Sequence, residues 1–530
     1  MMKLHTTLLS AVLCASMLSS NAYADLDAAT AKQIELMQEQ IKQLQAQLNE
    51  VKKNAASAKI AAKSAEHDAR VASSAATAAR EATLNPSAGG TKTAETAPAG
   101  GGIVLANKNN IKLTLGGFIE AAGIYRGRSE STDMASNFTT GIPFPNAPAN
   151  HLSEFRESAR QSRLSLLAQG NVDPDTDLSA YFEGDFLGAA VTANSNETNS
   201  YTPRIRHLYA TIDRGDMGLH VLAGQTWSLL TMDKKGIVAR QENIPLTIDA
   251  QYVPGFTFTR NPQLRVTKDF FDNTVTAGIS LESPQALVYN SGLSPYTGAP
   301  VFVLTGTGTL NTTAYTTDLA PDMIAKLAFD PGYGHYELYG LARFFRDRNH
   351  SNNSTIMGGG AGAAALLPII DKKLEFQLSG LAGTGVGRYG AAQLPDVTLK
   401  PDGGLATVDS AQLLAGLTAH PTEQWDVYAY GGVEGARKKA FPGSNGYGYG
   451  SPLYVNSGCE TENVGTCIAN TRMTEQLTMG AWWKFYKGSY GTMQAGLQDS
   501  YTRRQIFTGV GGAPNTNDNM TFISLRYYPF

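Results

Sequence analysis

The chain has 530 residues, a formal net charge of −3, 17% charged residues and 54 glycines. A net charge this close to zero excludes a protein that binds nucleic acid through an overall basic surface. Apolar runs stay shorter than about 18 residues, so the sequence predicts no transmembrane helix, although membrane-crossing β-strands need only about 9–11 residues.

Residues 1–24 have the pattern of a secretory signal peptide. Lys3 supplies a positive charge, an apolar stretch follows, and Ala22-Tyr23-Ala24 forms a small-residue cleavage site. We therefore predict cleavage before Asp25 and export of the mature chain.

Residues 25–84 are predicted to form an α-helical coiled coil in the periplasm. Apolar residues recur at alternating intervals of three and four, as along the seam between packed helices. The seam consists of Ile34, Met37, Ile41, Leu44, Leu48 and Val51, and alanines continue it in register to Ala79. A coiled coil implies an oligomer, but these mixed seam residues do not fix the number of helices, and a solitary alanine-rich helix is the alternative. Pro86 ends the helix, and the composition of residues 85–110 predicts a flexible linker.

From Ile111 onward the period of the apolar residues changes from 3.5 to 2. Ile111, Leu113 and Ile119 alternate with polar neighbours such as Lys112 and Glu120, which is typical of a strand with one apolar face. About sixteen such strands are predicted, at residues 111–126, 160–172, 177–188, 203–213, 217–228, 262–270, 273–282, 322–330, 335–346, 357–369, 372–387, 409–420, 424–436, 472–486, 489–506 and 518–530.

Short and long connections alternate between the predicted strands. The short ones are rich in turn residues, whereas the long ones span roughly 10 to 40 residues. This alternation is typical of an outer-membrane barrel with short periplasmic turns and long extracellular loops. The predicted fold class is therefore an all-β transmembrane barrel over residues 111–530, of about 16 antiparallel strands, with an N-terminal α-helical coiled-coil extension. A soluble β-sandwich is the alternative, but it does not require the alternation of short and long connections.

The last cysteines and the last residues of the chain carry two further signals. Cys459 and Cys467 lie in a polar, glycine-containing segment, and in an exported protein we expect them to form a disulfide rather than remain free thiols. No His or further Cys lies near them, so no metal site or cofactor is expected.

The terminal Phe530, preceded by aromatic residues, resembles the signal by which the bacterial barrel-assembly machinery accepts its substrates.

The long connection between the fifth and sixth predicted strands, residues 229–261, is expected to fold into the lumen. A barrel of about sixteen strands leaves an aqueous channel, and a long loop in this position constricts it. The predicted constriction loop contains the charged residues Asp233, Lys234, Lys235, Arg240 and Glu242.

Arginines gather in the strands around that loop. A guanidinium group stays charged at any working pH and pairs with carboxylates, so a cluster in a narrow passage attracts anions. The alternative is that these arginines pair with neighbouring acids and only stabilise the wall. The candidate selectivity residues are Arg160, Arg163, Arg204, Arg206 and Arg265, with the acids Glu183 and Asp185.

Several phrases of this region resemble one known family. They are "ESARQSRLSLLAQG", "AYFEGDFLG", "PRIRHLYATI", "LAGQTWSLL" and "NPQLRVTK". Together with the predicted coil and the terminal Phe, they resemble the DcaP-like trimeric outer-membrane porins of Gram-negative bacteria. The resemblance spans most of the mature chain and is densest over residues 156–270. It implies a homotrimeric sixteen-stranded channel for dicarboxylates or related small organic anions, with Arg163, Arg204, Arg206 and Arg265 in the matched phrases.

The predicted function is passive diffusion of small hydrophilic solutes through the outer membrane, with a preference for organic anions such as dicarboxylates. Its partners are outer-membrane lipid, two further copies of the chain and small anionic solutes, and no nucleic acid. No enzyme is expected, because a barrel enzyme needs a Ser/His/acid set, and of the eight histidines His207, His220 and His335 are isolated in strand patterns. A sugar-specific or general porin is the nearest alternative, using aromatics such as Tyr125, Tyr181, Tyr209 and Trp227. A structural envelope tether, whose coil binds periplasmic material, is another.

Overall fold

The computed structural model describes residues 39, 42–43, 102–108, 111–130, 132–139, 141–188, 202–289, 304–305, 314–315, 318–349, 352–443, 446–463 and 466–529. Met1–Ala88 and Gly89–Phe530 are separate units, and in the first unit the three described residues are helical. No helix among the described residues is long and apolar enough to cross a membrane. The predicted signal peptide, the seam residues Ile34, Met37, Ile41, Leu44, Leu48 and Val51, and Phe530 lie outside the described residues.

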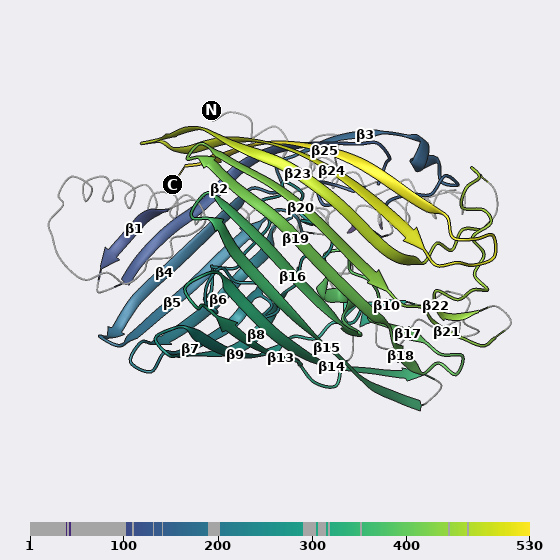
Figure 1. Ribbon diagram of the computed structural model, residues 1–530, viewed down its shortest axis with the longest axis horizontal. Helices are drawn as coiled ribbons and strands as arrows, with labels where there is room; N and C mark the ends of the chain where they lie inside the picture. The colour runs from purple at the N-terminus through teal and green to yellow at the C-terminus, as the bar shows by residue number, and fades with distance from the viewer. Residues whose placement is uncertain are drawn as a thin grey trace, which may run out of the picture. The chain divides into compact units, whose positions relative to one another are not determined.

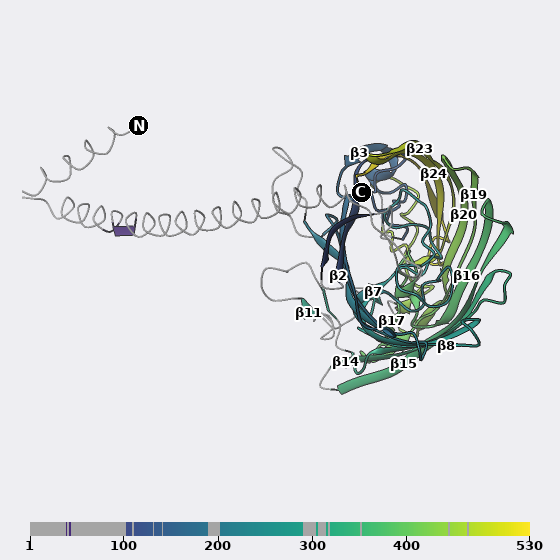
Figure 2. The same cartoon turned by 90° about the vertical axis from the view of Figure 1, so that its left-hand side faces the viewer.

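In the described part of the chain, sixteen antiparallel strands close into a barrel, as the sequence predicts. Each wall strand pairs with the next in the chain, and β25 closes the ring on β2, where Ile119 lies opposite Tyr527. Figure 1 shows the strands running obliquely side by side, and Figure 2 shows them around a ring with loop segments inside it. The wall strands are β2 (Ile111–Arg126), β4 (Arg163–Asp173), β5 (Thr176–Asp185), β6 (Arg204–Arg214), β7 (Leu219–Trp227), β8 (Arg260–Phe270), β9 (Val275–Glu282), β13 (Asp322–Phe329), β14 (His335–Asn349), β15 (Asn352–Ile370), β16 (Leu374–Thr384), β19 (Asp409–Thr422), β20 (Trp425–Ala436), β23 (Thr471–Gly488), β24 (Gly491–Ile506) and β25 (Asn515–Tyr528).

Both edges of β2 have an additional strand. β3 (Glu154–Ser158) pairs with the second half of β2 and β4 with the first half, so the two occupy one position in the wall. β1 (Ile103–Lys108) pairs with the part of β2 that β25 does not reach. The predicted linker, residues 85–110, therefore ends before Ile103, because a short apolar segment pairs with the free edge of β2.

The remaining short elements lie in the long connections. β10 pairs with β17 and β17 with β18, while β11 pairs with β12 and β21 with β22. Their bounds are η1 (Pro148–His151), β10 (Val288–Tyr289), β11 (Leu304–Thr305), β12 (Ala314–Tyr315), η2 (Gly387–Tyr389), β17 (Val397–Leu399), β18 (Leu405–Thr407), β21 (Lys439–Phe441) and β22 (Tyr447–Tyr449).

One connection differs clearly from the prediction. The sequence suggests a loop of about ten residues between the predicted strands 335–346 and 357–369, but β14 and β15 continue until Asn349 lies opposite Asn352. Polar residues occupy both faces of this hairpin end, so the alternation that marks a strand is absent there.

The two faces of the wall differ in polarity. Along β2, Ile119 is 62% exposed on the outside, whereas Glu120, one residue on, is fully buried on the inside. Near the short turns, the outer face carries aromatic side chains, including Trp425 stacked on Trp483 with ring centroids 6.0 Å apart. An apolar outer band with an aromatic girdle matches a lipid environment, and the polar inner face matches water.

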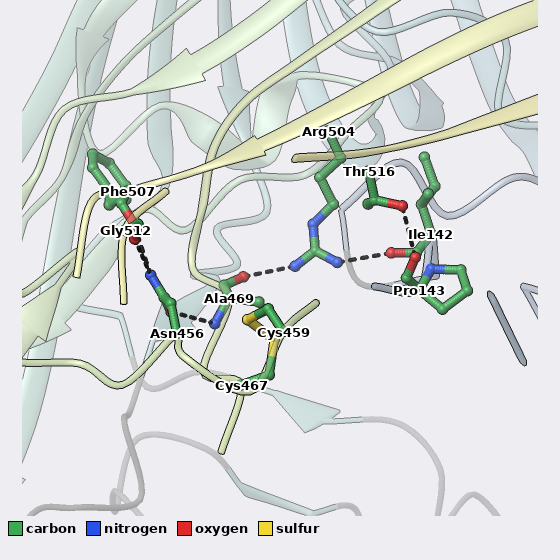
Figure 3. The surroundings of a disulfide bond; sticks show 10 residues. All are labelled: Ile142, Pro143, Asn456, Cys459, Cys467, Ala469, Arg504, Phe507, Gly512 and Thr516. Carbon is green, nitrogen blue, oxygen red and sulfur yellow. Dashed lines mark hydrogen bonds between the residues drawn. A yellow bond between two sulfur atoms is a disulfide. The ribbon is translucent and has the colours of Figure 1, made fainter. Parts of the chain in front are cut away.

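A disulfide anchors one of the long connections (Figure 3). Cys459 and Cys467 are joined, with an S–S distance of 2.04 Å. Nearby, Arg504 of β24 donates hydrogen bonds to the carbonyl oxygens of Ile142 (3.0 Å) and Ala469 (2.7 Å). Arg504 therefore holds the first and seventh long connections against the wall.

Candidate functional site

A single long loop, residues 228–259 between β7 and β8, crosses the interior of the barrel, and we call it the inward loop. A loop removed from water must find partners for its backbone N–H groups. Here those groups donate to side chains of distant wall strands: Leu229 to Glu282 (2.8 Å), Asp233 to Glu337 (2.8 Å), Ile248 to Gln498 (2.6 Å) and Gly255 to Glu434 (2.7 Å). Because these acceptors lie on β9, β14, β24 and β20, the loop spans the lumen. This is the segment from which the sequence predicts the constriction.

The first half of the inward loop is held by an enclosed ion-pair cluster. The Nζ atom of Lys326 lies 2.8 Å from Asp233 and 2.7 Å from Glu337, and all three side chains are almost fully buried. His335 contacts the same oxygen of Glu337, Oε1, at 3.0 Å. Of the predicted constriction residues, Asp233 is therefore a structural anchor, whereas Lys234 and Lys235 are exposed.

Arg240 and Glu242 lie between this cluster and the lumen wall. The guanidinium of Arg240 donates to the hydroxyl of Tyr209 (3.2 Å) and lies 5.6 Å from the ring centroid of Tyr181. Burial, reinforced by the nearby charge of Asp233, raises the pKa of Glu242 to about 7. Glu242 therefore changes charge close to neutral pH.

The second half of the inward loop packs against β20, β23 and the first long connection. The indole N–H of Trp482 donates to the carbonyl of Leu246 (2.8 Å), and Ser136 donates through its hydroxyl to Asp249 (2.6 Å). Burial raises the pKa of Asp249 to about 6, although the hydrogen bonds from Ser136 oppose the shift.

The arginines predicted on β6 meet the acids predicted on β5. Arg204 binds Asp185 with two hydrogen bonds (2.9 and 2.7 Å), and Arg206 contacts Glu183 (2.6 Å) and Asp185 (3.1 Å). A register shift after Glu183 lets both Arg206 and His207 point inward. Such a bulge re-aims side chains in a way that strand parity alone does not predict.

Two of the predicted arginines do not belong to this cluster. Arg160, in the break between β3 and β4, pairs with Asp133 (2.7 Å) and donates to the carbonyls of Phe186 and Gly188. Arg265 is buried and donates to the carbonyl of Trp227 (2.6 Å), so it supports the start of the inward loop.

Several lumen ion pairs expose the cation more than the acid. The side chain of Arg204 is 34% exposed and that of Asp185 is 1% exposed. The corresponding fractions are 25% and 11% for Arg163 and Glu183, and 15% and 0% for Arg526 and Glu120. The accessible surface of these pairs is therefore cationic, even though each acid is close behind.

A cavity of about 530 Å³ between the inward loop and the wall is lined by two of these cations, Arg163 and Arg526, but not by Arg204. Two buried donors at its lining, Nε of Arg163 and Nε2 of Gln161, have no hydrogen-bond partner among the described residues. Its basic lining residues are Arg163, Arg206, Lys234, Arg240, Lys484, Lys487 and Arg526, and its acidic ones are Glu183, Glu242, Asp249, Glu423 and Asp426. The sequence analysis did not single out Arg526, although it alternates with the apolar residues Leu525 and Tyr527 and therefore falls on the opposite face of its strand.

Tyr252 of the inward loop faces the same arginines. Burial alone would raise its pKa, but the charges of Arg206, Arg163 and Arg260 lower it to about 7. Its hydroxyl accepts a hydrogen bond from Arg206 (3.3 Å). The lowered pKa therefore reflects the positive charge of these arginines around the Tyr252 hydroxyl.

The aromatic residues considered for a sugar channel do not form an accessible row. Tyr125 lies on the outer face and is 50% exposed, whereas Tyr181, Tyr209 and Trp227 are buried. Trp227 packs edge-on against Tyr252 and Phe256 (centroids 6.0 and 5.7 Å apart). The part of the chain that the structure describes also contains no group of three or more His, Cys, Asp or Glu residues that could hold a metal ion.

Comparison with known proteins identifies the architecture. No protein-family model and no curated protein sequence matches the chain. Among solved structures, the outer membrane channel DcaP of Acinetobacter baumannii is similar, with a TM-score of 0.58 and 16% identity over 80% of this chain and 98% of that one. The fold is that of a porin barrel. The resemblance to DcaP-like porins predicted from the sequence is thus confirmed for the fold.

Two other porins match less closely. An anion-selective porin from Comamonas acidovorans has a TM-score of 0.42 and 11% identity, over 79% of this chain and 99% of that one. Pseudomonas putida OprB has a TM-score of 0.43 and 10% identity, over 78% of this chain and 94% of that one.

Proposed function

We propose that the chain is an outer-membrane channel for passive diffusion of small hydrophilic solutes, with a preference for organic anions such as dicarboxylates. The observation that carries the proposal is the exposure of the cation rather than the acid in the lumen pairs of Arg163, Arg204 and Arg526. An anion approaching along the lumen meets guanidinium groups first. The carboxylates behind them are largely desolvated, since their side chains are at most 11% exposed.

The electrostatics of a narrow passage strengthen this effect. Low-dielectric walls concentrate the field of the lining charges, which raises the local concentration of the oppositely charged solute. The Arg163 side chain, which is 25% exposed, supplies guanidinium N–H groups for a passing oxyanion. The lowered pKa of Tyr252 supports the same sign of potential.

The distribution of cations along one cavity supports a solute with two carboxylates. Arg163 and Arg206 lie on the β4–β6 wall, whereas Arg526 and Lys484 lie on β25 and β23, and all four line the same space. A dicarboxylate can contact both groups, whereas a monocarboxylate contacts one at a time.

In this proposal the barrel spans the outer membrane as a homotrimer, with the coil of residues 25–84 in the periplasm. The apolar outer face and the aromatic girdle around Trp425 and Trp483 support the membrane location. The tether function has no comparable support among the described residues.

The test is ion selectivity in planar lipid bilayers. Under a potassium chloride gradient, the reversal potential of the wild type should favour chloride, and the double variant Arg163→Gln, Arg204→Gln should reduce that preference. Dicarboxylates should block the chloride current more strongly than monocarboxylates or sugars. Arg503→Gln is the matched control, because Arg503 is an exposed arginine that pairs with Glu475 (3.4 Å) on the outer face. Cation selectivity of the wild type would contradict the proposal.

A further inference from the structure

The β14–β15 hairpin rises beyond its neighbours in the wall. β13 pairs with β14 only as far as Ala342, and β16 pairs with β15 only from Gly359 onward. Residues 344–349 and 352–357 therefore form a two-stranded ribbon above these neighbours, and Figure 1 shows the ends of β14 and β15 extending at the lower right. We call this segment the ribbon.

The inner face of the ribbon is covered by other parts of the chain. Phe345 and Ile356 pack into a cluster with Val397 and Leu405, and the N–H of Leu405 donates to the hydroxyl of Ser354 (3.0 Å). Asp347 is also on this face and is buried. The ribbon is thus held in place from the inside.

The outer face of the ribbon is exposed and changes from apolar to basic. Met357 is 64% exposed, and Arg346 and Arg348, further from the barrel, are exposed on the same face. Arg346 forms no hydrogen bond or ion pair with a described residue. The guanidinium of Arg348 donates only to the side-chain oxygen of its cross-strand neighbour Asn353 (2.7 Å). Two guanidinium groups two residues apart on a strand stand roughly 7 Å from each other.

The wall directly below the ribbon has unusually small outward residues. Gly340, Ala342, Gly359 and Ala361 face outward beside one another on β14 and β15. Further down, larger side chains such as Leu338 and Phe329 border a hollow of about 590 Å³ with an apolar lining. The outer surface therefore has a shallow band of small apolar residues. Above this band lie Arg346 and Arg348, which form no ion pair with a described residue.

We infer that the outer face of the ribbon binds the phosphorylated headgroup of an outer-leaflet lipopolysaccharide, with Arg346 and Arg348 on a phosphate and the acyl chains along the Gly and Ala surface. The inference rests on the outer-membrane location proposed above. Guanidinium groups pair with phosphate in a fork geometry, and the change from Met357 to Arg346 matches the boundary between hydrocarbon and headgroup. A second copy docked through the same face would bring these arginines together, which charge repulsion opposes.

Binding of a bisphosphorylated lipid A to the purified full-length protein in detergent tests the inference. The double variant Arg346→Gln, Arg348→Gln should bind it about tenfold more weakly or worse, because each basic residue at an anionic lipid surface contributes to binding. Arg503→Gln, which changes an exposed arginine that is already paired with Glu475, should bind like the wild type. A dephosphorylated lipid A should bind the wild type and the double variant equally weakly, and free inorganic phosphate should not displace the bound lipid.

Three outcomes would overturn the inference. One is equal binding of bisphosphorylated lipid A by wild type and double variant, and another is equal binding of the dephosphorylated lipid by the wild type. The third is a change of oligomeric state in the double variant with unaltered lipid binding, which would make the face an interface between copies. Reversal potentials in bilayers without lipopolysaccharide separate the two proposals, because they should respond to Arg163 and Arg204 but not to Arg346 and Arg348.

Discussion

Two walls of the lumen use the same residue types in opposite ways. On the β4–β6 wall, Arg163 and Arg204 remain accessible while their acids are buried behind them. On the β13–β14 wall, Lys326 and Arg343 are 0% and 1% exposed, enclosed between carboxylates. The difference arises because long connections cover the second wall but leave the first open to the cavity.

The enclosure decides what each charge contributes. An accessible cation interacts through water and is screened, so it contributes little to stability but can attract a solute. An enclosed cation balances the charge of carboxylates that water does not reach, so its loss leaves buried charge uncompensated. The comparison therefore predicts that substitutions on the β13–β14 wall mainly lower stability, whereas substitutions on the β4–β6 wall mainly change ion selectivity.

The largest expected effect on stability follows from Lys326→Met. The change leaves Asp233 and Glu337 adjacent and buried, with only His335 as a basic partner of Glu337, which costs about 3–5 kcal/mol of the free energy of unfolding. Urea unfolding of the protein in detergent micelles measures it. Lys484→Met is the matched control, because Lys484 pairs with Asp426 but is 29% exposed. Equal losses for the two variants would remove the distinction between the walls.

A smaller effect, dependent on pH, is expected from Asp249→Asn at the other end of the inward loop. Burial raises the pKa of Asp249 from 3.8 to about 6, so ionisation disfavours the folded loop. For an acid with a raised pKa, stability is full below the unfolded value and decreases as pH rises through the folded value. Between pH 4 and pH 7 the wild type should therefore lose on the order of 3 kcal/mol relative to the variant.

Urea unfolding of both proteins at pH 4 and pH 7 checks this prediction. The groups facing Asp249 are Ser136, the backbone N–H of Gln251 and, at longer range, the charge of Arg126. Parallel pH profiles for the wild type and the variant would contradict the prediction, because they would show that Asp249 ionises in the folded protein near its ordinary pKa.

The smallest effect on stability is expected from Arg204→Gln. Arg204 is partly exposed, so its pair with Asp185 contributes at most about 1 kcal/mol. Selectivity should nevertheless change, as measured by the reversal potential. A stability loss as large as that of Lys326→Met would show that Arg204 stabilises the wall and does not serve the solute.

Much of the fold follows from the sequence because each wall strand has an apolar outer face and a polar inner face. That contrast imposes a period of two on β2, β13 and β25, and turn residues mark the short connections. The hairpin end at Asn349 and Asn352 escaped prediction, because there neither face meets lipid and the alternation ends. β1 was not predicted either, because its pairing depends on a free edge of β2 that exists only in the closed barrel.

The sequence predicts which residue types gather at the candidate site, but it does not predict what each residue does there. The sequence indicates which strands carry Arg163, Arg204 and Arg206 and which loop is long enough to enter the lumen. It does not indicate that a bulge after Glu183 turns His207 inward, or that Arg265 supports the backbone of Trp227. These depend on contacts between segments far apart in the chain.

The sequence by itself determined the barrel, its strand positions and the gathering of basic residues around one long connection, because alternation and turn chemistry are local. Only the tertiary structure decided which charges water reaches. The backbone of the inward loop needs acceptors, and Glu282, Glu337 and Glu434 supply them from strands distant in sequence. Where the loop lies, charges are enclosed and stabilise the fold; where it leaves space, the same residue types remain available to a solute.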